Sequence, residues 1–187
     1  MITCTIVNIM LGKYDRFPTT ILHCSALLTH KNPIIKLQLL LIRSLRALND
    51  KITKYSISFA DYLRKFEGEI SFEVGVAEGI YFNYLDDEEV MRLSELLSKH
   101  GVFSSLDIIL IIRYHYIQGK KRIPLRADRY LLRFILHTSR IELYLFHEGG
   151  IMRITPEEVL AFVVDHVNHF IELEGLEKLH LEYIKTR

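Results

Sequence analysis

The sequence predicts an α+β fold in which internally duplicated helix-helix-hairpin-helix units surround a central antiparallel sheet, with an N-terminal β-rich extension. Three observations lead to this fold class: an internal repeat, alternating apolar segments typical of hairpins, and well-marked helix starts. The first copy of the repeat runs from Ser58 to Val90, and the second runs from Leu125 to Val159. The matching residues are Ala60-Asp61 and Ala127-Asp128, Tyr62-Leu63 and Tyr130-Leu131, Phe66 and Phe134, Ile70 and Ile141, Gly79-Ile80 and Gly150-Ile151, and Glu88-Glu89-Val90 and Glu157-Glu158-Val159.

The repeat can be extended through the preceding helices, which divides the chain into three segments. Residues 1–31 form the N-terminal extension, 32–101 the first copy, and 102–187 the second copy with a C-terminal helix. A two-stranded hairpin is marginally stable alone, so the two hairpins are expected to meet in one sheet. The two copies therefore favour one compact domain.

The extension contains two β-rich pieces, TCTIVNIML and TTILHCSALL, which predict two strands or a hairpin. A helix should follow from Ile34 to Asn49, because Asn32 suits an N-cap and Pro33 suits the first helical position. In the second copy the equivalent helix begins at Ser104 or Ser105 and ends near Gly119. The isoleucine-rich run Leu106–Ile112 is also compatible with a strand; the helix is preferred because the first copy reads as one.

The remaining elements of each copy are a short helix, a hairpin and a capped helix. The short helices are expected at Ser58–Phe66 and Leu125–His137, and the hairpins around Glu78-Gly79 and His147–Gly150. Capping boxes begin the last helices: D-x-x-E from Asp86 to Glu89, and T-x-x-E from Thr155 to Glu158. The first of these helices ends at Gly101. The second continues through Phe170, and a continuation past Gly175 is left open.

Composition restricts the class of protein. With 187 residues and 49% hydrophobic content, the chain can bury a sizeable core. Its 24 basic and 23 acidic residues give a net charge of +1, so any polyanionic partner must meet a local patch. No signal peptide is evident, and the most apolar run, 106–112, is far shorter than the roughly 20 residues that span a bilayer. Cys4 and Cys24 are too few for a disulfide framework; their pairing is left open, and we expect a cytoplasmic protein without a membrane partner.

A basic stretch in the second copy predicts a nucleic-acid site. Its cations are interleaved with aromatic side chains, a mixture that single-stranded nucleic-acid sites use for phosphates and bases. Asp128 is its only acid, whereas the matching part of the first copy is mixed in charge. A solvated charged face is the alternative reading. The candidate binding residues are Arg113, Tyr114, Tyr116, Lys120, Lys121, Arg122, Arg126, Arg129, Tyr130, Arg133 and Arg140.

The first copy has the opposite bias, since Glu69 to Met91 contains seven acids and no Lys or Arg. An acidic first hairpin and a basic second half also suggest assembly of one copy of the protein with another, as in a homodimer. An assembly or adaptor protein that binds no nucleic acid is therefore the alternative function.

Catalytic signatures are weak. Asp165, His166, His169 and Glu172 could approach one another on the C-terminal helix, but HxxH without further ligands does not establish a metal site. The sequence has no Gly-rich phosphate loop, nucleophile elbow or dinucleotide fingerprint. We expect no catalytic residue, metal or cofactor, and hence a binding protein rather than an enzyme.

One short stretch, Tyr62–Phe72 (YLRKFEGEISF), resembles the helix and acidic end of LAGLIDADG-type DNA endonucleases. Those enzymes are duplicated α/β proteins that place an acidic residue from each copy at a shared axis. The resemblance implies that Glu67 or Glu69 would be that residue here. The second copy offers His137, Thr138 and Ser139 and no acid, so the resemblance implies at most a degenerate endonuclease-like domain.

Overall fold

A single antiparallel sheet dominates the protein. The structure, a computed structural model, describes residues 12–58 and 65–186, without the side chains of 54–58 and 65–67. Within these ranges the chain forms nine strands and three helices. The predicted fold class is therefore wrong: the molecule is mainly β, and its units are not helix-helix-hairpin-helix repeats.

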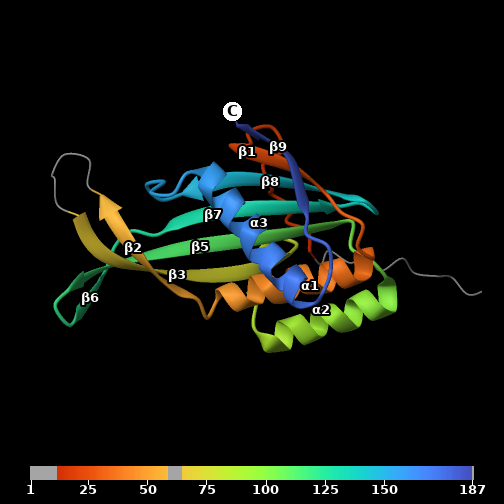
Figure 1. Cartoon of the computed structure of the whole chain (residues 1–187), viewed down its shortest axis with the longest axis horizontal. Coiled ribbons are helices and arrows are strands. Elements are labelled where there is room, and N and C mark those ends of the chain that lie inside the picture. Colours follow the sequence, from red (N-terminus) through yellow and green to blue (C-terminus); the bar gives the residue numbers. More distant parts are fainter. Residues whose placement is uncertain (1–11, 59–64, 187) are drawn as a thin grey trace, which may run out of the picture.

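The elements follow one another in an order that interleaves strands and helices (Figure 1). The sheet has the order β2-β3-β5-β7-β8-β1-β9, with β4 paired to β3 and β6 paired to β5. Strands from all three sequence segments thus join the same sheet. The bounds are β1 Cys24–Thr29, α1 Ile34–Leu48, β2 Ile52–Ser58, β3 Lys65–Glu78, β4 Tyr81–Tyr84, α2 Asp87–His100, β5 Ser105–Gln118, β6 Lys121–Pro124, β7 Asp128–Leu136, β8 Arg140–Gly149, α3 Pro156–Leu173 and β9 His180–Thr186.

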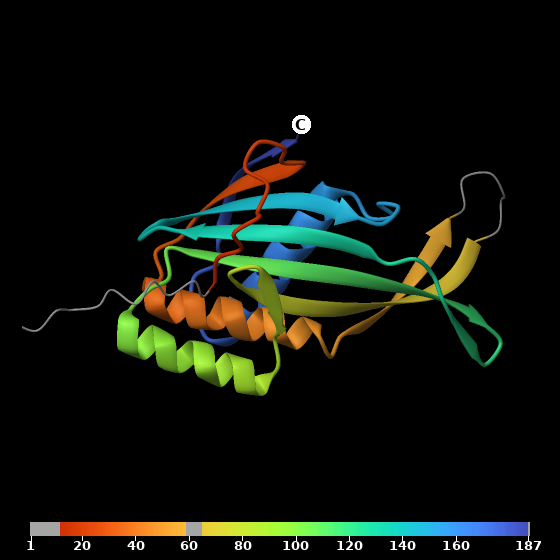
Figure 2. The ribbon, with the colours of Figure 1, turned by 180° about the vertical axis from the view of Figure 1, so that it is seen from behind.

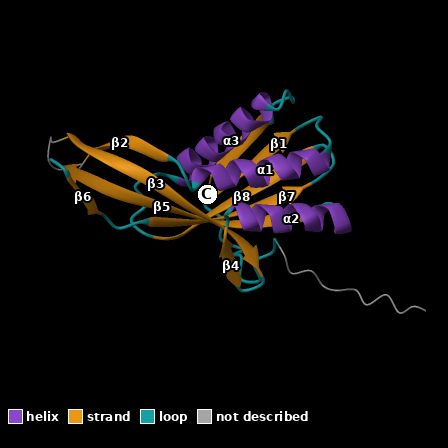
Figure 3. Ribbon diagram, turned by 90° about the horizontal axis from the view of Figure 1, so that it is seen from below, coloured by secondary structure: helices purple, strands orange, loops and turns teal. Residues whose placement is uncertain are grey.

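The helices cover one face of the sheet. Helix α1 packs on β3 and on α3, α3 packs on β1 and β8, and α2 lies against α1 (Figures 1 and 3). The main core lies between these helices and the alternate strand residues that face them, such as Phe72, Ile108 and Leu132. The opposite face, called the open face below, is crossed by the segment that precedes β1 (Figure 2).

The largest corrections concern segments predicted as helices. Residues 104–119 contain strand β5, and 125–137 contain strand β7. Both are central strands with apolar side chains on both faces, such as Leu110 and Ile111 in β5, so their apolar runs are nearly continuous and hide the two-residue period. The β-branched residues of Leu106–Ile112 were the correct signal. The predicted helix at 58–66 is also wrong where it is described, because Ser58 ends β2 and Lys65 begins β3; 59–64 lie outside the described residues.

Two of the three helices begin with the caps that the sequence predicts. At α1 the predicted cap is wrong: Pro33, not Asn32, is the N-cap residue, no side-chain hydrogen bond caps the helix, and Asn32 Nδ2 donates to the backbone oxygen of Glu177 at 2.6 Å. The Asp86 side chain accepts a hydrogen bond from the Glu89 backbone N–H at the start of α2. At α3 both hydrogen bonds of the capping box between Thr155 and Glu158 are present. The predictions of Asp86 and Thr155 as N-caps are confirmed because each rests on contacts within one helical turn.

The chain after α3 differs from the prediction. Helix α3 ends at Leu173, Gly175 adopts φ +67°, and the chain then forms the unpredicted strand β9. The predicted second strand of the second hairpin is also absent: Ile151 and Met152 lie in the loop between β8 and α3. Among the described residues, the two copies share a sequence of strand, glycine turn and capped helix, which is β3–β4–α2 in one and β8–α3 in the other.

Two β-ribbons extend the sheet beyond the helices. One is formed by β2 and β3, and the other by the end of β5 with β6, and they project from the same end of the molecule (Figures 1 and 3). At the N-terminal side, the strand predicted in TTILHCSALL is β1, whereas TCTIVNIML falls on residues 1–11, outside the described residues. Cys24 is a free, buried thiol, and Cys4, whose pairing with it the sequence leaves open, lies outside the described residues.

Candidate nucleic-acid interface

The predicted binding residues do not form one surface. They divide into buried tyrosines, arginines paired across the open face, and cations on the β5–β6 ribbon. Only the last group presents several exposed cations close together in the chain.

Tyr114 and Tyr130 belong to the core. Both are fully buried, and their hydroxyls are used internally. Tyr114 Oη donates to Asp128 Oδ2 at 2.8 Å, and Tyr130 Oη donates to the backbone oxygen of Ile154. Burial, which has the larger effect, and the neighbouring Asp128 carboxylate together raise the pKa of Tyr114 far above its ordinary value. Neither ring is available for stacking on a base.

Asp128 fixes the loop between β8 and α3. Its carboxylate is fully buried and accepts hydrogen bonds from the backbone N–H groups of Ile151, Met152 and Arg153 at 2.7 to 2.8 Å. Burial alone would raise the pKa of Asp128, but the hydrogen bonds from Tyr114 and these three N–H groups together lower it. The loop approaches so closely that a Cβ on Gly150 would lie 2.1 Å from Asp128 Oδ1. The one acid of the basic stretch is therefore a structural group.

A histidine completes this buried cluster. His147 Nε2 lies 3.6 Å from Asp128 Oδ1, and the His147 ring packs against Tyr130 with centroids 5.0 Å apart. The backbone N–H of His147 donates to Nδ1 of His23 at 2.9 Å. The cluster joins β5, β7 and β8 to the segment before β1 and is closely packed. We assign it to stability.

Arg133 is the least available of the predicted cations. Its guanidinium donates to both carboxylate oxygens of Asp107, at 2.6 and 2.7 Å, and lies 4.2 Å from the centre of the Phe17 ring. Asp107 also accepts the backbone N–H of Tyr14 at 2.6 Å. Asp107 is 1% exposed and Arg133 15%. This clamp holds the segment before β1 against the open face.

Three more predicted arginines have carboxylate partners on or near the open face. Arg113 donates to Glu73, Arg129 donates to Glu148 at 3.1 Å, and Arg140 lies 3.8 Å from Glu142. Arg113 on β5 meets Glu73 on β3, and Arg129 on β7 meets Glu148 on β8, because these strands are neighbours in the sheet; Arg140 and Glu142 lie two residues apart on β8. The open face is thus nearly balanced in charge, and a phosphate would have to compete with these carboxylates.

The remaining cations lie on the β5–β6 ribbon. Gly119, with φ +59°, forms the turn, and Lys120, Lys121 and Arg122 follow it on the projecting end. Arg126 lies just after the ribbon, and all four side chains are exposed. Arg122 Nε is 3.0 Å from Glu69 Oε2. We call Lys120, Lys121, Arg122 and Arg126 the basic ribbon. Tyr116, at its base, is partly buried and makes an internal contact.

The histidine motif of α3 also has an internal role. His166 is 9% exposed, and its Nε2 lies 2.8 Å from the backbone oxygen of Ser44 in α1. Burial lowers the pKa of His166, which favours the neutral ring. Within residues 12–58 and 65–186, no group of three or more His, Cys, Asp or Glu side chains is placed to hold a metal ion.

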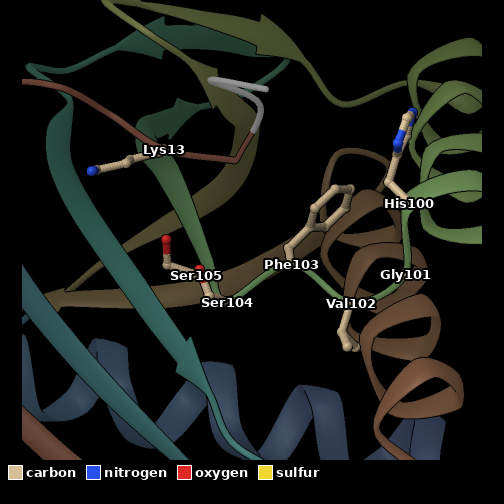
Figure 4. A pocket seen from close by; sticks show the side chains of 7 residues that line it. All are labelled: Lys13, His100, Gly101, Val102, Phe103, Ser104 and Ser105. Carbon is tan, nitrogen blue, oxygen red and sulfur yellow. The ribbon is translucent and has the colours of Figure 1, made fainter. Parts of the chain in front are cut away.

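The end of α2 borders a shallow hollow of about 250 Å³ (Figure 4). Phe103 lies between His100 and the two serines in this view, and the lining includes Lys13. None of the seven lining residues is a carboxylate that could orient His100 as a general base. The hollow offers no catalytic arrangement.

The stretch that resembles an endonuclease helix lies in a different element. Residues 65–72 belong to strand β3, and Glu69 pairs with Arg122. The resemblance implied that Glu69 lies at the acidic end of a helix, and this implication is wrong. The Glu67 side chain lies outside the described part of the chain.

The sequence reasoning missed the two acids that organise this region, Asp107 and Asp128. Each is an acid inside a strongly apolar or basic run, a pattern that indicates a buried, paired carboxylate. Their partners, Tyr14 and the loop at 151–153, are distant in sequence and could not be read from spacing.

Comparisons of the chain with protein-family models, with curated proteins and with solved structures found no match. Among the described helices, none is long and apolar enough to cross a membrane.

Proposed function

We propose that this protein is a non-catalytic nucleic-acid-binding protein that contacts phosphates through the basic ribbon. The observation that carries the proposal is the placement of Lys120, Lys121, Arg122 and Arg126, all exposed, on or beside a two-stranded β-ribbon that projects from the body. Glu69 is the one acid that forms a described ion pair with this group. We propose the cytoplasm as its place of action.

The shape of the ribbon supports the same ligand. A two-stranded β-ribbon fits the major groove of duplex DNA, and its cations can also follow the backbone of a single strand. Because Tyr114 and Tyr130 are buried, base stacking by them no longer favours single strands. We therefore propose a contact with the phosphate backbone that is largely independent of sequence.

The experiment is a fluorescence-anisotropy titration of labelled single-stranded and duplex oligonucleotides at several salt concentrations. Four phosphate contacts give a slope of log K against log salt of about −2.8 for single strands and about −3.6 for duplex. Raising the salt from about 50 to 200 mM should therefore weaken single-strand binding about 50-fold.

Matched variants locate the contact. Lys120→Glu, Lys121→Glu and Arg126→Glu together leave the Arg122–Glu69 pair intact and should make the single-strand slope shallower by about 2. The control reverses three exposed lysines elsewhere, Lys36, Lys99 and Lys178, and changes the net charge equally. A wild-type protein without salt-dependent binding would refute the proposal, as would an equal loss in both variants.

A further inference from the structure

Strand β9 has an edge that the described chain leaves open. It lies at the end of the sheet order, paired only with β1, and all seven of its residues are exposed (Figure 1). Helix α3 packs on β1 and β8 and leaves the β9 side chains uncovered. Leu181, Tyr183 and Ile184 are 44%, 53% and 37% exposed. An open edge with apolar side chains is a template for a further strand.

Register with β1 assigns each β9 side chain to a face. Opposite residues of an antiparallel pair share a face. Ile184 lies opposite Ala26, which belongs to the core, and therefore lies on the helix-covered side. Tyr183 and Lys185 lie opposite Leu27 and Ser25, on the open face. The pairing is irregular between Leu27 and Leu28, so only the part of β9 after Glu182 continues the regular ladder.

We propose that β9 pairs with β9 of a second copy of this chain, antiparallel, about a twofold axis at Ile184. A twofold axis normal to the sheet must pass midway between one residue of the regular stretch and the same residue of the partner strand, because opposite residues share a face. At Ile184 it places the two isoleucines opposite each other and each Tyr183 opposite the partner's Lys185, so that each ammonium meets an aromatic ring.

The alternative centres fit less well. An axis at Lys185 would place two ammonium groups opposite each other, which is destabilising. An axis at Tyr183 would place Glu182 next to the centre of the ladder, opposite Ile184, yet Glu182 lies at the irregularity and accepts a hydrogen bond from Thr29 Oγ1. An axis at Ile184 brings Glu182 only to the end of the ladder. The self-complementary register commits the edge to a second copy, and this inference stands independently of nucleic-acid binding.

Disulfide trapping tests the register directly. Directly opposite Cα atoms of an antiparallel pair are about 4.5 to 5.5 Å apart, within the range that a disulfide spans. Ile184→Cys should therefore form a dimer rapidly under mild oxidation. The control Leu181→Cys is similarly exposed but would lie several residues from its symmetry mate, beyond the range that a disulfide spans. It should cross-link only through random collisions, slower by a factor on the order of ten.

Both variants are made with Cys4→Ser, and Cys24 can remain. Cys24 is buried. Its burial, and to a lesser extent the charge of Glu157, raise its pKa to about 11, so it forms little reactive thiolate. Equal or faster cross-linking of the Leu181 variant would overturn the proposed register.

Sedimentation of the unmodified chain provides the second measurement. The mass should rise from 22.0 kDa toward twice that value with concentration, and Ile184→Lys should abolish the rise. Because Ile184 is at the surface, this variant should keep the circular-dichroism spectrum of the wild type. A monomer at every concentration, or a dimer that survives Ile184→Lys, would overturn the proposal.

Discussion

Asp128→Asn should destabilise the protein more than any comparable surface change. In the wild type, Oδ1 accepts the N–H groups of Ile151 and Met152, and Oδ2 accepts Tyr114 Oη and the Arg153 N–H. An asparagine keeps one oxygen, so its NH₂ group must face one pair of donors. The tyrosine hydroxyl can rotate and accept, but a buried backbone N–H is left without an acceptor.

The magnitude follows from these contacts. An unsatisfied buried N–H costs about 1 to 3 kcal/mol, and each remaining hydrogen bond loses about 1 kcal/mol when its acceptor becomes neutral. With two such bonds remaining, we expect the free energy of unfolding to fall by about 3 to 5 kcal/mol in urea titrations. The control is Asp165→Asn, at an exposed position of α3, which should change it by less than about 0.5 kcal/mol.

The pH dependence provides a second readout. Because the pKa of Asp128 is lowered in the folded state, its stabilisation is complete above the unfolded-state value near 3.8 and is lost as the pH falls toward the folded pKa. The variant should lack this acid-dependent part. A loss below about 1 kcal/mol, or an unchanged acid limb, would contradict a structural role for the carboxylate.

Three further predictions concern single contacts. Thr155→Ala removes the N-cap of α3 and should lower the free energy of unfolding by about 1 kcal/mol; an unchanged urea midpoint would contradict this. Arg133→Ala leaves Asp107 buried without its partner and should cost about 3 to 5 kcal/mol; the reasoning fails if the loss resembles that of an exposed arginine. Tyr114→Phe should weaken alkaline unfolding, because burial raises the pKa of Tyr114 and the wild type loses that contribution as the pH rises above about 10, so an identical alkaline limb would refute it.

Local signals in the sequence were reliable, and longer-range inference was not. Asp86 and Thr155 mark helix starts correctly because their capping is complete within one turn, whereas the predicted cap Asn32 instead binds the backbone of Glu177, far along the chain. The helix predicted at 104–119 rests on analogy with the first copy, whereas the β-branched residues of this segment favour the strand that the structure contains.

Strand β9 shows a different limit. HLEYIKT carries polar and apolar residues without a buried face, because an edge strand outside the helix layer has no core to specify its pattern. Its strand conformation depends on pairing with β1, which lies at the opposite end of the sequence. No window of sequence around β9 contains that information.

A count of charged residues along the sequence likewise does not show which of them are paired in the fold. That pairing determines where a ligand can bind. The sequence places eleven candidate residues in one stretch, but strand register pairs Arg113 with Glu73, Arg129 with Glu148 and Arg133 with Asp107. Such pairing requires an acidic side chain within reach on a neighbouring strand. The β5–β6 ribbon projects beyond most of those neighbours, so Glu69 is the one acid that the described part of the chain brings into an ion pair there. Cations on a projecting ribbon therefore remain available to a polyanion, whereas arginines within the sheet are paired with carboxylates of neighbouring strands.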